Sequence, residues 1–338
     1  MTFRVGVTAS ARRRDGTTLY DLSLLDEAPE VDWEFLAENT RELRPDQVAG
    51  FDGLVVMSGR VTAATLAGAD RLLVLARLGV GYDTVDVDAC TKAGVLLTIA
   101  PDGVRRPMAS SAMAFVLALA HRMLQKDRNV REGGWDRFEN AGVGLTGRTL
   151  GLIGVGNLGR DVVALSEPFG MRRIAYDPYL ATAPPGVELV PLETLMREAD
   201  FVVVLCPLTG ETRGLVNAER LGLMKPTAFL INVARGPIVD QAALTEALQE
   251  RRIAGAALDV FEREPVEPDD PLLALDNVIL APHAIGMTDE IFRGCGQSAS
   301  RSVLAVARGR VPDYVVNRDA LDHPRLEGLR RAEGPASR

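Results

Sequence analysis

The sequence has few of the features that mark disulfide-rich, metal-binding, membrane-spanning or nucleic-acid-binding proteins. Its 338 residues include only three cysteines and three histidines. The cysteines, Cys90, Cys206 and Cys295, are odd in number and far apart, which argues against a disulfide framework and a zinc site, so no metal is expected. No hydrophobic run approaches the roughly 20 residues that a membrane-spanning helix needs. The net charge of −8 argues against nucleic acid as a partner.

The remaining composition is that of an ordinary globular protein. Hydrophobic residues make up 47% and charged residues 25% of the chain, which is enough for a sizeable core, and the length favours about two domains. The first residues, Met1 to Val7, already have the pattern of a strand, so no signal peptide is expected. Together with the scarcity of cysteine, this predicts a cytoplasmic protein.

A glycine-rich stretch is the strongest local signal. A short apolar run, Leu150 to Ile153, leads directly into Gly154-Val155-Gly156-Asn157-Leu158-Gly159, after which a helical pattern begins. In a dinucleotide site of this type, the first glycine permits a tight turn and the second lets a pyrophosphate approach the backbone. The third lets the helix pack closely on the strand. Ordinary glycine-rich turns share the same hexapeptide, so it needs support from the rest of the chain.

That support comes from an acidic residue after the next predicted strand. Asp177 follows the run Arg173–Tyr176 and lies about 20 residues beyond the glycine-rich turn, where an acid hydrogen-bonds the ribose hydroxyls. A carboxylate at this point also repels the 2′-phosphate of NADP, and no arginine follows it directly. The sequence therefore predicts an NAD site, with NADP less favoured.

Short apolar runs alternate with helical patterns along both halves of the chain, which is typical of parallel sheets with helices on both faces. The predicted strands of the first half are Phe3–Val7, Trp33–Leu36, Leu54–Met57, Leu72–Leu75 and Val95–Ile99. Those of the second half, after Leu150–Ile153 and Arg173–Tyr176, are Phe201–Leu205, Ala228–Ile231, Gly255–Leu258 and Val278–Leu280. The predicted class is α/β with doubly wound parallel sheets.

Three other segments carry expectations of their own. Pro107 is expected in the first turn of one long helix that runs to about Arg131, because proline suits that turn. Residues 132–148 are expected to form a loop, in which Trp135 is a candidate subunit contact. The tail from Asn317 to Arg338 is charged and is expected to be partly disordered.

Polar residues follow the last four predicted strands, and ligands of parallel sheets bind at such strand ends. His283 can transfer a proton near neutral pH. Glu264 could orient its ring, with Glu262 as a competitor for that role. Arg235 has the planar guanidinium that binds a carboxylate through two hydrogen bonds. Beside a nicotinamide site, these groups suit hydride transfer to or from C2 of a 2-hydroxy or 2-oxo acid.

Taken together, the motifs resemble the D-isomer-specific 2-hydroxyacid dehydrogenase family, which includes glyoxylate/hydroxypyruvate reductase and D-3-phosphoglycerate dehydrogenase. The matching stretches are Gly79 to Asp83, Gly147 to Gly159, Cys206 to Thr212, Met224 to Asp240, Ala257 to Pro265, and Pro282-His283 with Gly286 and Thr288. The resemblance implies two Rossmann-like, flavodoxin-like domains with a cleft between them. Residues 1–105 plus 288–338 would bind the substrate, and residues 106–287 would bind NAD. It also implies a homodimer formed through the NAD-binding domain.

The resemblance also assigns roles to individual residues. The family's catalytic residues fall on Arg235, Glu264 and His283. Its cofactor contacts fall on Gly154, Gly156, Asn157, Leu158, Gly159, Asp177, Pro207, Thr212, Val233, Ala234, Arg235, Asp259, His283 and Gly286. Its substrate contacts fall on Ser58, Gly59, Val80, Gly81, Arg235 and His283, with Val80 and Gly81 as a backbone cradle for the carboxylate. Two alternatives remain on the same scaffold: an NAD-sensing, corepressor-like binding protein, or a dehydrogenase of the formate or phosphite type.

Overall fold

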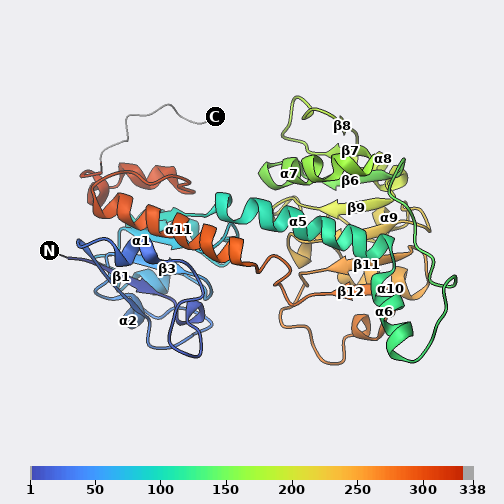
Figure 1. The fold of residues 1–338 in the computed structure, drawn as a ribbon. Helices are drawn as coiled ribbons and strands as arrows, with labels where there is room; N and C mark the ends of the chain where they lie inside the picture. Colours follow the sequence, from blue (N-terminus) through green and yellow to red (C-terminus); the bar gives the residue numbers. More distant parts are fainter. Residues whose placement is uncertain (1, 330–338) are drawn as a thin grey trace. The chain divides into compact units, whose positions relative to one another are not determined.

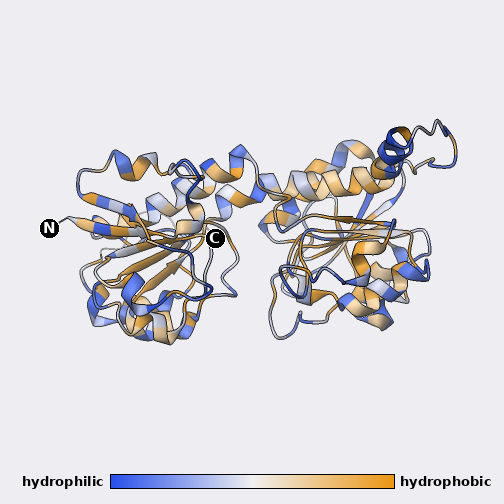
Figure 2. Cartoon of the chain, turned by 90° about the horizontal axis from the view of Figure 1, so that it is seen from below, coloured by the Kyte–Doolittle hydropathy of each residue, from blue (hydrophilic) through white to orange (hydrophobic). Residues whose placement is uncertain are grey.

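The chain forms two compact units in a computed structural model that describes residues 2–329 (Figure 1). Unit 1 consists of Met1–Val104 together with Met287–Arg338, and unit 2 consists of Arg105–Gly286. Each unit is built on its own parallel sheet, which confirms the predicted α/β class with two parallel sheets. Figure 2 shows mostly hydrophobic strands inside each unit and helices of mixed hydropathy around them.

Unit 1 contains a five-stranded parallel sheet in the order β2-β1-β3-β4-β5. Its strands are β1 (Phe3–Val7), β2 (Val31–Phe35), β3 (Gly53–Val56), β4 (Val74–Arg77) and β5 (Leu96–Thr98). Its short helices are α1 (Ser23–Asp26), α2 (Pro45–Val48), α3 (Ala63–Leu66) and α4 (Val87–Ala93). Leu54 and Leu75 of the sheet share one buried cluster with Leu66 of α3 and Cys90 of α4, so these helices cover one face.

The last long helix, α11 (Asp289–Ala307), packs against β3 and β4 of unit 1. Thr288 caps its first turn by accepting a hydrogen bond from the Ile291 N–H, and two acidic residues in that turn suit the positive end of the helix dipole. A Cβ on Gly53 of β3 would lie 3.6 Å from the Val303 side chain, which shows how closely the helix approaches the strand. The sheet of unit 1 is therefore completed by residues from the far end of the chain.

Unit 2 contains a seven-stranded parallel sheet in the order β12-β11-β10-β9-β6-β7-β8. The strands are β6 (Thr149–Ile153), β7 (Arg172–Tyr176), β8 (Glu188–Leu189), β9 (Phe201–Val204), β10 (Phe229–Asn232), β11 (Gly255–Leu258) and β12 (Val278–Leu280). From β6 the chain builds outward through β7 and β8, and then returns to place β9 on the other side of β6. The point where the strand order reverses is where open parallel sheets bind ligands.

Helices cover both faces of this sheet. The helices are α5 (Pro101–Ala120), α6 (Met123–Arg131), α7 (Asn157–Ser166), α8 (Leu192–Glu198), α9 (Ala218–Leu221) and α10 (Gln241–Gln249). Along β9, Val202 and Val204 join a buried cluster with residues of α8, α9 and α10. The alternate residues Phe201 and Val203 join a second cluster with residues of α5 and α7. Because successive side chains of a strand point to opposite faces, the sheet is doubly wound.

The predicted helix from Pro107 to Arg131 is wrong in its start and in its continuity. Helix α5 begins at Pro101, so Pro107 lies inside it, and the chain bends by 59° between α5 and α6. At the bend Arg122 has a left-handed φ of 49°, and the Ala120 carbonyl accepts its hydrogen bond from the Val143 N–H. The loop 132–148 thus returns to end the helix.

Among residues 2–329, no single helix is long and apolar enough to cross a membrane. Only α5 and α6 taken together reach that length and composition, and that pair is bent by 59°.

The tail from Asn317 to Arg338, which was expected to be partly disordered, has a defined structure as far as residue 329, and residues 330–338 lie outside the described part. Two 3₁₀ helices, Arg318–Asp322 and Pro324–Leu326, follow Asn317. The Asn317 side chain accepts from the Leu97 N–H at 2.8 Å and donates to the Val95 carbonyl at 2.9 Å. The Arg325 guanidinium donates to the carbonyls of Ala69, Asp70, Leu72 and Ala93. These bonds satisfy backbone groups of unit 1, which explains the order.

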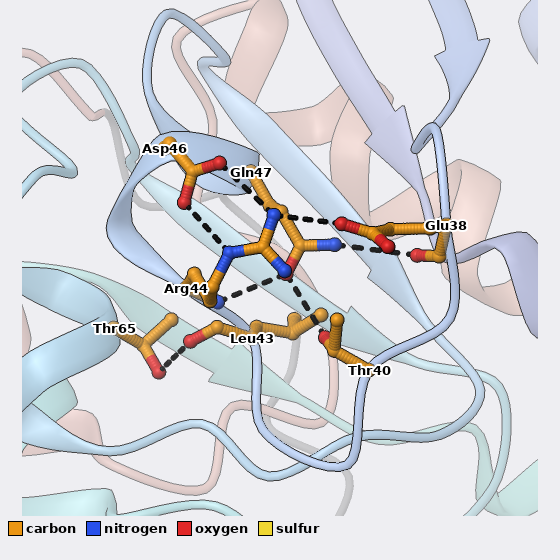
Figure 3. A network of polar contacts seen from close by, with 7 residues as sticks. All are labelled: Glu38, Thr40, Leu43, Arg44, Asp46, Gln47 and Thr65. Atoms are coloured by element: carbon orange, nitrogen blue, oxygen red, sulfur yellow. Dashed lines mark hydrogen bonds and ion pairs between the residues drawn. The ribbon is translucent and has the colours of Figure 1, made fainter.

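A polar network fixes the loop between β2 and β3 of unit 1 (Figure 3). The Arg44 guanidinium binds Glu38 at 2.7 Å and Asp46 at 3.1 Å, and the Gln47 side chain accepts from the Arg44 N–H. The Thr65 hydroxyl donates to the Leu43 carbonyl, which ties the loop to α3. The Leu43 N–H in turn donates to the Arg60 carbonyl, so the loop supports the segment that follows β3.

Candidate active site

The three glycines of the turn after β6 differ in how much space a side chain would have at each position. Gly154 has a φ of +97°, and a Cβ there would lie 2.9 Å from the Cys206 backbone nitrogen. A Cβ on Gly159 would lie 2.7 Å from the Gly154 carbonyl oxygen. Gly156 is the N-cap of α7, and a Cβ there meets nothing within 4 Å. The protein's own packing therefore requires the first and third glycines, while the second borders open space.

Asp177 holds the turn from the neighbouring strand end. Its Oδ2 accepts a hydrogen bond from the Val155 N–H at 2.9 Å, and its Oδ1 accepts from the Tyr179 N–H at 3.1 Å. The carboxylate thus lies beside the turn that opens α7. A glycine N-cap open to solvent and a carboxylate next to it fit the pyrophosphate and ribose of an NAD-type dinucleotide.

The turn after β9 completes this side of the sheet. Cys206 packs against Gly154, and the residues that follow it form a compact turn. The Thr212 hydroxyl donates to the Pro207 carbonyl at 2.7 Å and accepts from the Thr209 N–H at 2.7 Å. Pro207 and Thr212, both predicted cofactor contacts, therefore belong to one hydrogen-bonded turn next to the glycine-rich one.

A buried asparagine shapes the strand end that carries Arg235. Asn232 is 1% exposed, and its side chain accepts from the Ala234 N–H at 3.1 Å and donates to the Arg235 carbonyl at 3.0 Å. A Cβ on Gly236 would overlap the Phe261 backbone, so only glycine allows this close approach. Val233, Ala234 and Arg235 are thus held in one fixed turn after β10, next to the strand that leads to Glu264.

Asp259 fixes the loop that presents His283. The carboxylate is 2% exposed, and its Oδ1 accepts from the N–H groups of Ala284 and Ile285 at 2.8 and 2.9 Å. The backbone carbonyl of Asp259 accepts a hydrogen bond from the His283 N–H at 2.7 Å. Burial raises the pKa of Asp259 above its ordinary value, although the two backbone N–H groups oppose this. His283 itself has a left-handed φ of 53°, a conformation that non-glycine residues adopt mainly where the surroundings impose it.

His283 and Glu264 form a hydrogen-bonded pair, with 2.8 Å between His283 Nδ1 and Glu264 Oε2. Burial by itself would raise the pKa of Glu264. The hydrogen bonds from His283 and the Phe261 N–H and the charge of Arg235 outweigh burial and hold that pKa below its ordinary value. An ionised Glu264 places a proton on Nδ1 and leaves Nε2 for a ligand. Glu262 instead accepts from the Gln241 N–H, so it does not contact the ring.

A pocket of about 570 Å³ is lined by both members of the pair, Glu264 and His283. Its walls are largely apolar and include Phe261, Val266, Leu273 and Leu280. Gly286, the last predicted cofactor contact, is buried and follows Ile285 in the chain. The Ile285 carbonyl accepts a hydrogen bond from the Ser111 hydroxyl of α5 at 2.8 Å. The loop 283–286 is therefore held from two sides, by Asp259 and by Ser111.

The predicted substrate contacts of unit 1 follow two neighbouring strands. Ser58 and Gly59 come after β3, and Val80 and Gly81 come after β4. The two strands pair in register, with Val56 opposite Arg77, so both groups lie at the same carboxyl edge of the five-stranded sheet. In unit 2 the predicted cofactor and catalytic residues follow β6, β7, β9, β10, β11 and β12 at the carboxyl edge of the seven-stranded sheet.

Sequence reasoning missed the residues that support these groups. Asn232, Ser111 and Arg77 each hold a turn through a side-chain hydrogen bond to a backbone carbonyl. Asn232 belongs to the motif Met224 to Asp240 and directly follows the predicted strand Ala228–Ile231, and that position was a usable signal. Ser111 and Arg77 lie within a helix and at a strand end, where neither residue type is unusual, so the sequence held no such signal.

Comparison with known proteins agrees with this geometry. Residues 113–284 match the family model described as D-isomer specific 2-hydroxyacid dehydrogenase, NAD binding domain. A glyoxylate reductase from Thermococcus onnurineus is 41% identical over 316 residues, which cover 89% of this chain and 93% of that protein. A D-3-phosphoglycerate dehydrogenase from Methanocaldococcus jannaschii is 39% identical over 314 residues, which cover 91% of this chain but 59% of that longer protein.

A solved structure has a similar fold over most of the chain. The crystal structure of D-lactate dehydrogenase from Aquifex aeolicus, in complex with NAD and lactic acid, matches with a TM-score of 0.79 and 27% identity, over 90% of this chain and 96% of that one. The chain belongs to the D-isomer-specific 2-hydroxyacid dehydrogenase family, as an enzyme that uses an NAD-type cofactor.

Proposed function

We propose that the protein transfers a hydride between NAD and C2 of a D-2-hydroxy acid or the corresponding 2-oxo acid. The observation that carries this proposal is the 2.8 Å Glu264–His283 pair. It stands at the same sheet edge as the glycine-rich turn and Arg235, because all of these residues follow strands of one parallel sheet.

Each of the three side chains has a distinct task in the proposed reaction. His283 gives a proton from Nε2 to the substrate oxygen during reduction and takes it back during oxidation. Glu264 stabilises the protonated ring and fixes its orientation through Nδ1. Arg235 binds the substrate carboxylate and polarises the carbonyl group. When bound, the nicotinamide supplies or accepts the hydride at C4.

For unit 1, we propose that the N–H groups of Val80 and Gly81 bind the substrate carboxylate, and that Ser58 and Gly59 contact the rest of the acid. Their common position at the carboxyl edge of the five-stranded sheet supports this assignment. A relative that is 41% identical is a glyoxylate reductase, which favours a short 2-oxo acid such as glyoxylate.

For the cofactor, we propose NAD rather than NADP. Asp177 supports this choice because its carboxylate lies beside the glycine-rich turn, where the extra phosphate of NADP would meet a negative charge. We propose that Gly154, Gly156, Asn157, Leu158, Gly159, Pro207, Thr212, Val233, Ala234, Asp259 and Gly286 form the rest of the cofactor site.

The experiment is NADH oxidation with glyoxylate, hydroxypyruvate, pyruvate and bulkier 2-oxo acids, together with formate and phosphite in the oxidative direction. We expect turnover of at least one short 2-oxo acid, and its near-complete loss in His283→Ala while NADH still binds. Turnover of formate or phosphite alone would favour the one-carbon or inorganic alternative. NADH binding without any turnover would favour an NAD-sensing protein.

We also propose that the chain forms a homodimer through unit 2. Helix α6 has no buried residue, although a helix of this length gains most of its stability from packing. The loop after it carries Trp135 and Phe138, each 80% exposed. Light scattering on the protein and on a Trp135→Ser, Phe138→Ser double variant tests this, and a monomeric parent protein would reject it.

A further inference from the structure

We propose that Arg77 is a positioning residue, which holds the turn 79–82 so that its backbone N–H groups face the substrate carboxylate. The inference rests on the proposed function, because it concerns how unit 1 would bind that carboxylate. Arg77 is the last residue of β4 and is partly buried, and sequence reasoning assigned it no role.

The carbonyl groups of the turn are already engaged by the protein. Arg77 Nε donates a hydrogen bond to the Gly81 carbonyl at 3.0 Å. The Gly79 carbonyl accepts from the N–H of Ala100, two residues after the end of β5, at 2.8 Å. Leu78 enters the turn with its N–H bonded to the Val56 carbonyl of β3 at 3.0 Å. The turn is thus tied to both neighbouring strands and to the side chain of its own strand end.

The N–H groups of the turn, in contrast to its carbonyl groups, have no hydrogen-bond partner among residues 2–329. These are the N–H groups of Gly79, Val80 and Gly81. The side chain of Val80 is 38% exposed, and a Cβ on Gly79 would meet nothing within 4 Å. Successive backbone N–H groups with no partner form a concave site that binds anions. A carboxylate is the anion that the proposed reaction brings to this unit.

Arginine is needed because two glycines make the turn easy to deform. Gly79 and Gly81 have no Cβ to restrict their backbone angles. Without a donor at Gly81, its peptide group could rotate and point its carbonyl oxygen toward the bound anion, which would repel it. The Nε–H of Arg77 prevents this rotation, and the positive charge of the guanidinium adds to the attraction for a carboxylate.

The test compares Arg77→Met, which removes donor and charge, with Arg77→Lys, which keeps the charge but loses the guanidinium. We expect Arg77→Met to raise the KM for the 2-oxo acid about 10- to 100-fold, with kcat changed less than about 3-fold. Inhibition by oxamate, a non-reacting carboxylate analogue, should weaken in parallel, while the Kd of NADH should not change. Arg77→Lys should give an intermediate KM.

Arg71→Gln is the matched control, since Arg71 lies just before β4 but binds Asp52 on the surface. It should keep the parent's KM. A general structural role for Arg77 would instead lower kcat, NADH affinity and the urea midpoint together. If Arg77→Met does not fold, Arg77→Lys and its oxamate inhibition carry the test. If the parent reduces 2-oxo acids and folded Arg77 variants keep its KM, the positioning role is refuted alone. If the parent reduces none, the proposed function and this role fail together.

Discussion

Replacing Gly156 with alanine should weaken NADH binding and leave the fold almost unchanged. A Cβ at this position meets nothing within 4 Å, and its φ of −68° is open to any L-residue. Gly156 is the N-cap of α7, where alanine in place of glycine costs about 0.5 kcal/mol. In a domain of this size that cost lowers Tm by only ~1–2 °C.

The effect on the cofactor should be much larger, because the new methyl group occupies the space where a pyrophosphate would meet the helix N-terminus. Losing one charge-assisted hydrogen bond costs about 1.5–3 kcal/mol, which raises the Kd of NADH roughly 10- to 100-fold. NADH fluorescence titration measures this Kd, and thermal unfolding followed by circular dichroism measures Tm without the cofactor.

Gly159→Ala provides the contrast within the same turn. Its Cβ would lie 2.7 Å from the Gly154 carbonyl oxygen, so the helix or the strand must move. Overpacking of this kind costs about 1–3 kcal/mol and should lower Tm by roughly 2–12 °C, more than Gly156→Ala does. The reasoning is refuted if Gly156→Ala binds NADH as tightly as the parent, or if its Tm falls as far as that of Gly159→Ala.

Three further predictions concern charge and thiol chemistry. Burial raises the pKa of Asp259, so its ionisation in the folded protein lowers the free energy of unfolding as the pH rises above the ordinary pKa of 3.8. Asp259→Asn removes this ionisation and should therefore remove that loss of stability. Urea unfolding should show the variant at least as stable as the parent at pH 7, with the difference closing toward about pH 4; a widening gap in acid would contradict this sign. Asp177→Ala should improve the kcat/KM ratio of NADPH to NADH, and an unchanged ratio would place ribose recognition elsewhere. Burial raises the pKa of Cys90 and Cys295 to about 12 and that of Cys206 to about 11. A thiol-specific reagent at pH 8 should therefore modify at most Cys206, and only slowly. Bound NADH should slow the modification of Cys206 further. Rapid reaction of two or more thiols in the folded protein would show that these side chains are not buried as described.

Much of the architecture follows from local sequence patterns. Every strand except β8 was predictable because the apolar runs are short and bounded by glycine, proline or polar residues. Strand β8, which was missed, has only two residues, Glu188 and Leu189. The glycine-rich turn was predictable because its three glycines carry separate steric demands, two of which the packing at Gly154 and Gly159 shows directly. The pairing of Glu264 with His283 could be suggested from the sequence, but only the geometry separates Glu264 from Glu262.

The features that escaped prediction depend on contacts between distant segments. Pro107 was assigned to a first helical turn because proline is common there, yet the helix begins six residues earlier, at Pro101. The bend after Ala120 depends on Val143, which returns from a loop. Order after Asn317 depends on a polar side chain that binds backbone groups about 220 residues earlier, at Val95 and Leu97. No local pattern encodes such partners.

The discontinuous construction of unit 1 sets an order for folding during synthesis. Unit 2 is one continuous segment, Arg105–Gly286, so the whole of it is synthesised before α11. Until then, the face of β3 and β4 that α11 covers stays exposed in the nascent chain. The domain that begins first is therefore the one that finishes last. The apolar face of the unit 1 sheet stays uncovered while all of unit 2 is synthesised. At this stage the protein is most prone to aggregation.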